Sequence, residues 1–195
     1  MDRLQEYYKN SIMDNLCQEY KGMWQSASHD PLSLVRLSLS QQSIPHVATY
    51  AFNNKGLTKS YIKKNFSKYI NGYTVTDADS VEGYTYGLYV DYDYDQDLIA
   101  DKDVLHIMWT VGATVLVPST KCPVVYVSNR SKVHIVCEGY NSVKVYLFDK
   151  SEITVEDTDE DTDVTVYRYS DDANVNIGKY CLSKRVRDFR KQLKL

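Results

Sequence analysis

Closely spaced aspartates are the residues of this chain best suited to binding a metal ion. They occur at alternate positions, as at the start of a calcium-binding EF-hand loop: Asp91, Asp93, Asp95 and Asp97. Such a loop needs a glycine at its sixth position and a bidentate glutamate at its twelfth. This chain has Gln96 and Lys102 at those positions. The EF-hand pattern therefore fails, and Asp91, Asp93 and Asp95 remain candidate ligands of a looser calcium site only.

The four histidines and four cysteines form no recognisable catalytic or zinc-binding motif. No histidine lies three or four residues from another metal ligand on a predicted helix, and there is no HExxH or CxxC pair. The phosphate-binding patterns GxxxxGK[ST] and GxGxxG are also absent from the sequence. We therefore expect neither an enzyme nor a protein with a cofactor.

A cluster of basic residues is a second candidate site: Lys55, Lys59, Lys63, Lys64 and Lys68. The surrounding sequence predicts a helix over residues 58–70 with Thr58 as its N-cap. The first three lysines are four residues apart, so they share one face. A basic helix after two shorter ones resembles a helix-turn-helix, which predicts nucleic-acid binding. The alternative is a solvated outer face paired with the acidic segment that begins at Asp77.

A five-residue pattern in the second half of the chain predicts the β-strands that would position the candidate residues. It reads small, any, β-branched, any, β-branched, and it recurs at a nearly constant step, starting at Ser131, Asn141, Ser151, Thr162 and Ala173. Alternation at period two predicts half-buried strands. Fainter copies starting at Asp103, Ala113 and Pro123 extend the series over residues 103–177. A regular repeat with two strands per coil of about 20 residues is typical of a solenoid.

We therefore predict an α+β protein with a small helical N-terminal domain, a β-solenoid and a C-terminal capping helix. The alternative is an antiparallel β-sandwich or meander, although no Asn-Gly or Asp-Gly turn occurs within residues 103–177. The predicted segments are a helical domain (1–72, with earlier helices at 2–24, 32–41 and 44–52), a transition strand and acidic loop (73–102), a repetitive β domain (103–180) and a basic capping helix (181–195).

Alternate strands of a two-strand coil stack on the same wall, and this predicts an aromatic surface. Tyr126, Tyr146 and Tyr167 recur with the period of one coil and face outward, with Phe148 beside them. The other wall carries polar side chains: Lys132, His134, Glu152, Thr154, Asn174 and Asn176. An exposed aromatic ladder would be a large apolar patch, so we predict an interaction surface there. It could be covered by a second copy, by the chain's own helical part, or by a glycan.

Three short strings add a resemblance: Leu16-Cys17-Gln18-Glu19-Tyr20 with Trp24, Ile70-Asn71-Gly72-Tyr73, and Gly83-Tyr84-Thr85. Together with the strand repeats, they resemble uncharacterised proteins of gut bacteria and their temperate phages. The resemblance covers most of the chain. It implies a phage or mobile-element setting and a helical front joined to a repetitive β back, and it supplies no site residues.

These observations favour a non-catalytic interaction or structural protein, such as a virion accessory component or a protein that binds a host factor. The alternatives are a nucleic-acid-binding regulator acting through residues 58–70 and a carbohydrate-binding module along the tyrosine wall. We expect the partner to be a second copy or another protein. The sequence has no apolar run of membrane-spanning length and no apolar signal core at its start. We therefore expect it in the bacterial host cytoplasm or in the virion.

Overall fold

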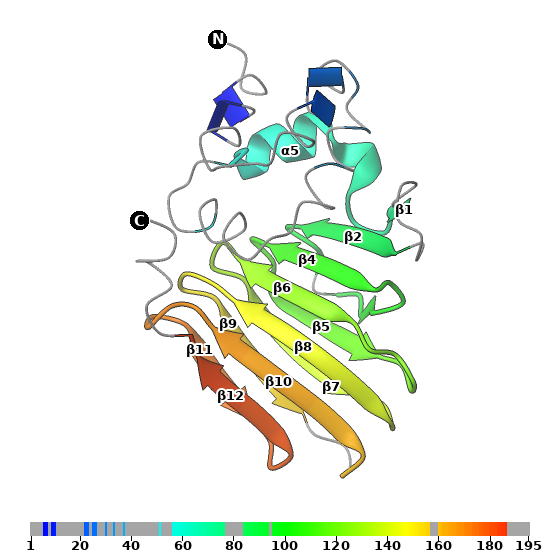
Figure 1. The fold of residues 1–195 in the computed structure, drawn as a ribbon, viewed down its shortest axis with the longest axis vertical. Coiled ribbons are helices and arrows are strands. Elements are labelled where there is room, and N and C mark those ends of the chain that lie inside the picture. The colour runs from blue at the N-terminus through cyan, green and yellow to red at the C-terminus, as the bar shows by residue number, and fades with distance from the viewer. Residues whose placement is uncertain are drawn as a thin grey trace.

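The structure is a computed structural model that describes residues 56–76, 84–93, 95–156 and 160–186, together with isolated residues before 56. The helices predicted at 2–24, 32–41 and 44–52 fall almost wholly outside the described residues, as does the segment 187–195. The described part contains one short α-helix followed by a stack of β-strands (Figure 1).

The strands form two sheets. Sheet A has the order β1-β2-β4-β6-β8-β10-β12 and sheet B the order β11-β9-β7-β5-β3. The strands of sheet A are β1 (Thr74–Thr76), β2 (Thr85–Val90), β4 (Val104–Met108), β6 (Val124–Ser128), β8 (Asn141–Leu147), β10 (Thr162–Arg168) and β12 (Cys181–Arg185). Those of sheet B are β3 (Leu98–Ile99), β5 (Val111–Val117), β7 (Lys132–Cys137), β9 (Glu152–Glu156) and β11 (Asn174–Ile177).

From β2 onward, consecutive strands alternate between the two sheets, and neighbours within each sheet are parallel. The chain therefore winds as a β-solenoid of about five turns over residues 86–185. The predicted solenoid is confirmed. The alternative of an antiparallel sandwich or meander is wrong, because only β1 and β2 pair antiparallel among the described strands.

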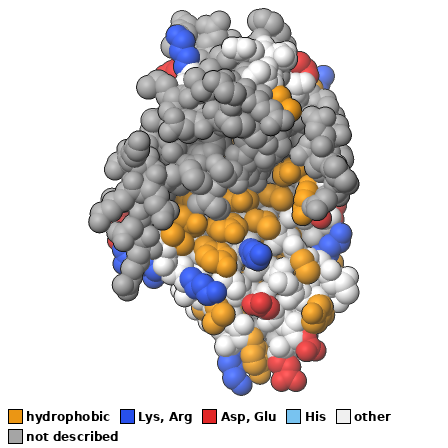
Figure 2. Space-filling view, in the orientation of Figure 1, with side chains coloured by type: hydrophobic (Ala, Val, Ile, Leu, Met, Phe, Trp, Pro, Cys, Tyr) orange, Lys and Arg blue, Asp and Glu red, His pale blue; other side chains and the backbone are white. Residues whose placement is uncertain are grey.

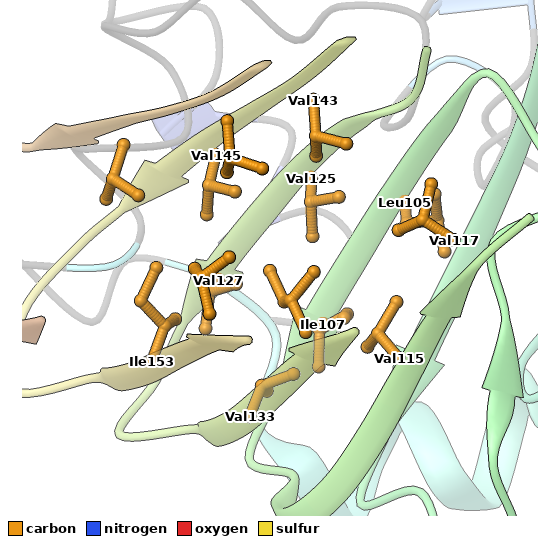
Figure 3. Packing of buried hydrophobic residues seen from close by; sticks show 14 of the residues in the cluster. Leu105, Ile107, Val115, Val117, Val125, Val127, Val133, Val143, Val145 and Ile153 are labelled. Atoms are coloured by element: carbon orange, nitrogen blue, oxygen red, sulfur yellow. The ribbon is translucent and has the colours of Figure 1, made fainter. Parts of the chain in front are cut away.

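The β-branched rows of the sequence pattern line the interior of the solenoid. One column runs through Leu105, Val125, Val145 and Val166, which are paired in register and completely buried. Figure 3 shows such residues pointing into the space between the two sheets. Parallel stacking places identical positions above one another, so branched side chains of similar size fill successive layers without gaps.

Polar corners replace hairpin turns between the sheets. At the corner after β6, Asn129 and Arg130 both have positive φ, 57° and 61°. Their backbone N–H groups donate to the Asp149 carboxylate of the next coil, at 2.6 and 3.1 Å. The small residue at the first position of the five-residue pattern can also join two coils. The hydroxyl of Ser151, for example, accepts a hydrogen bond from the backbone N–H of Ser131 in the preceding coil, at 3.2 Å. Buried backbone groups are thus satisfied between coils rather than within a turn.

The N-terminal end of the solenoid is covered by the predicted basic helix. The prediction of a helix over residues 58–70 is met by α5 (Lys59–Asn65) and a 3-10 turn, η1 (Ser67–Tyr69). Thr58 is its N-cap, as expected, since its hydroxyl accepts from the Tyr61 N–H at 3.4 Å. The apolar side of this segment packs on the outer face of β2, in a cluster that includes Ile62, Phe66, Ile70, Tyr86 and Val90.

The first coil begins earlier than predicted. The strand expected within the transition segment 73–102 is β2, which pairs in parallel with β4 and is therefore part of the solenoid. The interior at this end is closed by Tyr89 and by Lys102, whose ammonium group lies 5.8 Å from the Tyr89 ring centroid. Lys102 is almost fully buried and pairs with Asp101 at 2.7 Å. Gly87 leaves room for this lysine, since a Cβ there would lie 2.7 Å from its Cδ.

The prediction of a capping helix over residues 181–195 is wrong for 181–185. These residues form β12, which pairs in parallel with β10. The apolar residues Leu182 and Val186 suggest helical spacing, but the register with β10 turns this segment into one more rung. Its inward positions hold Cys181, Ser183 and Arg185, which pair with Val164, Val166 and Arg168 of β10, so Ser183 takes the place of an aliphatic residue and Arg185 follows another arginine. Polar and charged side chains in an inward row end the core and discourage further strand addition.

Candidate interaction surface

A ladder of aromatic rings runs down the outer face of sheet A. The strand register places His106, Tyr126, Tyr146 and Tyr167 in one column, followed by Lys184. The first pair of ring centroids is 4.7 Å apart and the next two pairs are each 5.1 Å apart. Adjacent planes lie within 25° of parallel. The predicted alignment of the three tyrosines is therefore present, and their rings stack face to face.

A second aromatic stack lies beside this ladder. Phe148 and Tyr169 follow β8 and β10, and their ring centroids are 5.1 Å apart. Each also contacts the ladder, with Phe148 lying 6.4 Å from Tyr126 and Tyr169 lying 6.3 Å from Tyr146. The prediction named Phe148 but not Tyr169. The same repeat would have found Tyr169, since it follows Phe148 by the same step that separates Tyr146 from Tyr167.

The N-terminal half of the aromatic face is covered by the chain itself. Tyr126 is 7% exposed and Phe148 is completely buried, in a cluster with Ala51. Burial raises the pKa of the Tyr126 hydroxyl well above its ordinary value. Tyr126, predicted as an anchor for a partner, and Phe148, predicted to lie beside it on the interaction surface, are therefore packed within the chain. Own-chain packing, one of the three expected coverings, accounts for this half of the face.

The C-terminal half remains accessible. Tyr146, Tyr167 and Tyr169 are half-buried, and on β12 Leu182 is 54% exposed. Two exposed lysines, Lys144 and Lys184, lie on the same face, and the Lys184 ammonium is 5.8 Å from the Tyr167 ring centroid. We call these six residues the C-terminal ladder surface. Figure 2 shows hydrophobic side chains gathered on one face of the β domain, with basic and acidic side chains beside them.

Sequence reasoning missed Leu182 and Lys184 because it assigned them to a helix. The alternation of side chains between the two faces of the strand could have identified Leu182 and Lys184. In residues 181–185 the side chains alternate between the interior and the outer face, as in β10, and Lys184 continues the column of Tyr167. The spacing of that last step is shorter than that of the earlier coils, and this hid the repeat.

The polar residues predicted for the outer face of sheet B lie there, next to an apolar column made of Ile99, Leu116 and Val136. Lys132 pairs with Glu152 at 3.0 Å, and His134 lies 3.2 Å from Glu156 on the neighbouring strand. Thr154, Asn174 and Asn176 are exposed. Rows of alternating charge and amide groups are typical of a hydrated surface, and they contrast with the aromatic face of sheet A.

The basic helix is tied to the solenoid by an acidic residue. Asp91 accepts hydrogen bonds from Lys63 at 2.6 Å and from Lys59 at 3.1 Å. The hydrogen bond from Lys63, and to a smaller extent that from Lys59, holds the pKa of the Asp91 carboxyl below its usual value. Lys64 and Lys68 are exposed, and Lys55 lies outside the described residues. The pairing expected as the alternative to nucleic-acid binding is therefore present for two of the five lysines.

The acidic string does not come together as a metal site. Asp91 is engaged by lysines, and the Asp93 carboxylate accepts from the Asp95 N–H at 3.2 Å, closing a local turn. In the part of the chain that the structure describes, no group of three or more His, Cys, Asp or Glu side chains is arranged to hold a metal ion.

Comparison with known proteins adds no relative: no family model, curated protein or solved structure matches this chain. Among the residues described above, no helix is both long enough and apolar enough to span a membrane.

Proposed function

We propose that this chain is a non-catalytic interaction protein that binds a protein partner through the C-terminal ladder surface. The supporting observation is the gradient of burial along one continuous aromatic column. Tyr126 is buried by the chain itself, whereas Tyr146 and Tyr167 on the following rungs stay half-exposed. Tyrosines of this kind, together with an exposed leucine, are typical of the centre of a protein interface.

The stacking of the rings favours a protein over a glycan or a nucleic acid. Sugars and bases bind aromatic residues through the ring face. In the ladder both faces of Tyr146 are covered, by Tyr126 and Tyr167, and the outer face of Tyr167 lies toward Lys184. The surface therefore offers ring edges, hydroxyl groups and ammonium groups, which suit the side chains of another protein.

The end strands of sheet A are poorly suited to pairing with another chain, so we favour association through the outer face of this sheet. At one end, β1 pairs with β2, and α5 packs on the outer face of that strand. At the other end, β12 carries Lys184 and the inward-row residue Arg185, which pairs with Asp171. Charges on an edge strand discourage pairing with another chain. The resemblance of short sequence strings to uncharacterised proteins of gut bacteria and their temperate phages is our reason for proposing a virion accessory component or a protein that binds a host factor.

The experiment combines light scattering of the purified chain with binding assays against the purified products of the neighbouring genes. We expect the wild-type chain to self-associate or to bind one of those products. The paired substitution Tyr167→Ser and Leu182→Ser should abolish that interaction, and Asn176→Ser on sheet B should preserve it. A chain that stays monomeric and binds no neighbouring product would refute the proposal, as would binding that survives the paired substitution.

A further inference from the structure

The chain already shows what kind of element the outer face of sheet A accepts. Ile62 of α5, with Phe66 and Ile70 after it, packs against Tyr86 and Val90 of β2. Ile62 lies in α5, Phe66 is the C-cap residue of that helix, and Ile70 follows the 3-10 turn η1, so the apolar side of the helix continues through the turn. The face of sheet A thus accommodates a helical segment with an apolar stripe, while the flanking lysines are paired by Asp91.

The C-terminal ladder surface resembles the surface on which α5 packs, but it carries basic residues where that surface has the acidic residue Asp91. It occupies the same columns of the sheet, since Leu88 of β2 is in register with His106, Tyr126, Tyr146 and Tyr167. Its charged residues are Lys144 and Lys184, in place of an acid. On the outer positions of β8, β10 and β12 the acidic residue is Asp163, at the far margin of the face from Tyr169.

We infer that the partner at this surface is an amphipathic helix with acidic flanks, supplied by another protein. The inference rests on the proposed function and names the partner's chemistry. Three neighbouring strands are about 10 Å across, and a helix with its side chains is about 10–12 Å wide, so one helix lying along β10 covers β8 and β12 as well. Its apolar stripe would contact Tyr167, Tyr169 and Leu182, and its carboxylates would face Lys144 and Lys184.

A second copy of this chain fits less well as the source of that helix. Its own α5 is basic, with Lys59, Lys63 and Lys64, and it has no acidic residue in its first turn. Docking it here would bring like charges together around Lys144 and Lys184, which costs free energy and slows association. Charge complementarity therefore argues against α5 of a second copy and favours a helix of a different protein.

The test uses two synthetic helical peptides with the same leucine stripe, one with glutamates and one with lysines on its flanks. Fluorescence anisotropy with the full chain should show micromolar binding of the acidic peptide, weakened by salt, and at least roughly tenfold weaker binding of the basic one. Lys184→Glu and Tyr167→Ser should each weaken acidic-peptide binding by roughly tenfold or more. The matched changes Lys150→Glu and Tyr140→Ser, at exposed corner residues, should leave it unchanged.

Several results would overturn this inference. They are equal binding of both peptides, no binding of the acidic peptide, insensitivity to both ladder substitutions, and displacement by a single-stranded oligonucleotide that itself binds more tightly. Circular dichroism of each variant checks folding, and Lys184→Glu alters only an exposed side chain. If the acidic peptide fails while Tyr167→Ser with Leu182→Ser still abolishes binding of a natural partner, the helix is refuted and the proposed function stands.

Discussion

Replacing ladder tyrosines in pairs tests the stacking that connects the coils. In Tyr146→Leu and Tyr167→Leu the side chain stays apolar but loses its ring. Tyr146 stacks on rings at both sides, Tyr126 and Tyr167, whereas Tyr167 stacks on one ring and faces Lys184 on the other side. Each favourable aromatic pair contributes about 0.5–1.5 kcal/mol beyond area burial. We therefore expect Tyr146→Leu to cost about 1–3 kcal/mol and Tyr167→Leu about half as much.

The decisive quantity is the coupling free energy of the pair. The double variant loses the Tyr146–Tyr167 stack only once, so its cost should fall short of the sum of the single costs by about 0.5–1.5 kcal/mol. Urea unfolding of all four proteins gives these differences, and each kcal/mol should shift the thermal midpoint by about 2–4 °C. As a control, Tyr140→Leu should add to Tyr167→Leu within about 0.5 kcal/mol, because Tyr140 lies at a corner outside the ladder.

A coupling within about 0.3 kcal/mol of zero would refute the stacking. The two residues are a full coil apart in sequence, so only a parallel, in-register pairing of β8 with β10 brings their rings to 5.1 Å. An antiparallel meander predicts no such coupling. The cycle therefore checks the architecture as well as the aromatic contact.

Three further substitutions test the ends of the solenoid. Asp91→Asn should destabilise docking of α5 by less than about 1 kcal/mol, because the ion pairs are solvent-exposed. Since the folded-state pKa of the Asp91 carboxyl is lowered, this stabilisation is present above the unfolded pKa near 3.8 and is lost as pH falls through the folded pKa. Urea unfolding at neutral and at acidic pH measures the difference. Gly87→Ala should cost about 1–3 kcal/mol in the same assay by displacing Lys102, and an unchanged midpoint would contradict the packing described. Ser183→Val with Arg185→Leu should make the chain associate end to end as its concentration rises in sedimentation experiments, and a strictly monomeric variant would show that the inward polar row does not protect this end.

The parts of the fold that repeat could be predicted from the sequence, because each coil reports the same pattern again. The rows that begin at Ser131 and Ser151, for example, pair in register as their phase indicated. The aromatic column followed from the nearly equal spacings between Tyr126, Tyr146 and Tyr167. Thr58 was recognisable as an N-cap from its residue type and position alone.

What covers each outer position could not be predicted in the same way. The burial of Tyr126 depends on packing near Ala51, which is distant in sequence, and no local pattern records that contact. The strand at residues 181–185 was missed for a similar reason. Leu182 and Val186 fit a helix locally, and only the hydrogen-bonding edge offered by β10 decides for a strand. Tertiary context overrides local preference at both places.

The outward-facing residues of sheet A do, however, show where packing by the rest of the chain ends. In one column of sheet A, Val104 and Val124 pack beneath the cover, and the next rung has the exposed Lys144. The change from valine to lysine marks the boundary at β8. The aromatic column crosses the same boundary without interruption, since Tyr126 on the covered side stacks on Tyr146.

The choice between phenylalanine and tyrosine follows from this boundary. Both phenylalanines that the structure describes, Phe66 and Phe148, are buried, whereas Tyr169, which stacks on Phe148, is half-exposed and carries a hydroxyl. A tyrosine ring can pack on its neighbour while its hydroxyl stays in water, so the stack can continue from a covered region into an accessible one. A column made of phenylalanine would leave a purely apolar patch at β10, and a column of polar residues would lose the stacking. Tyrosine at Tyr146 and Tyr167 meets both requirements, and this is the composition expected of a surface that stays hydrated until a partner binds.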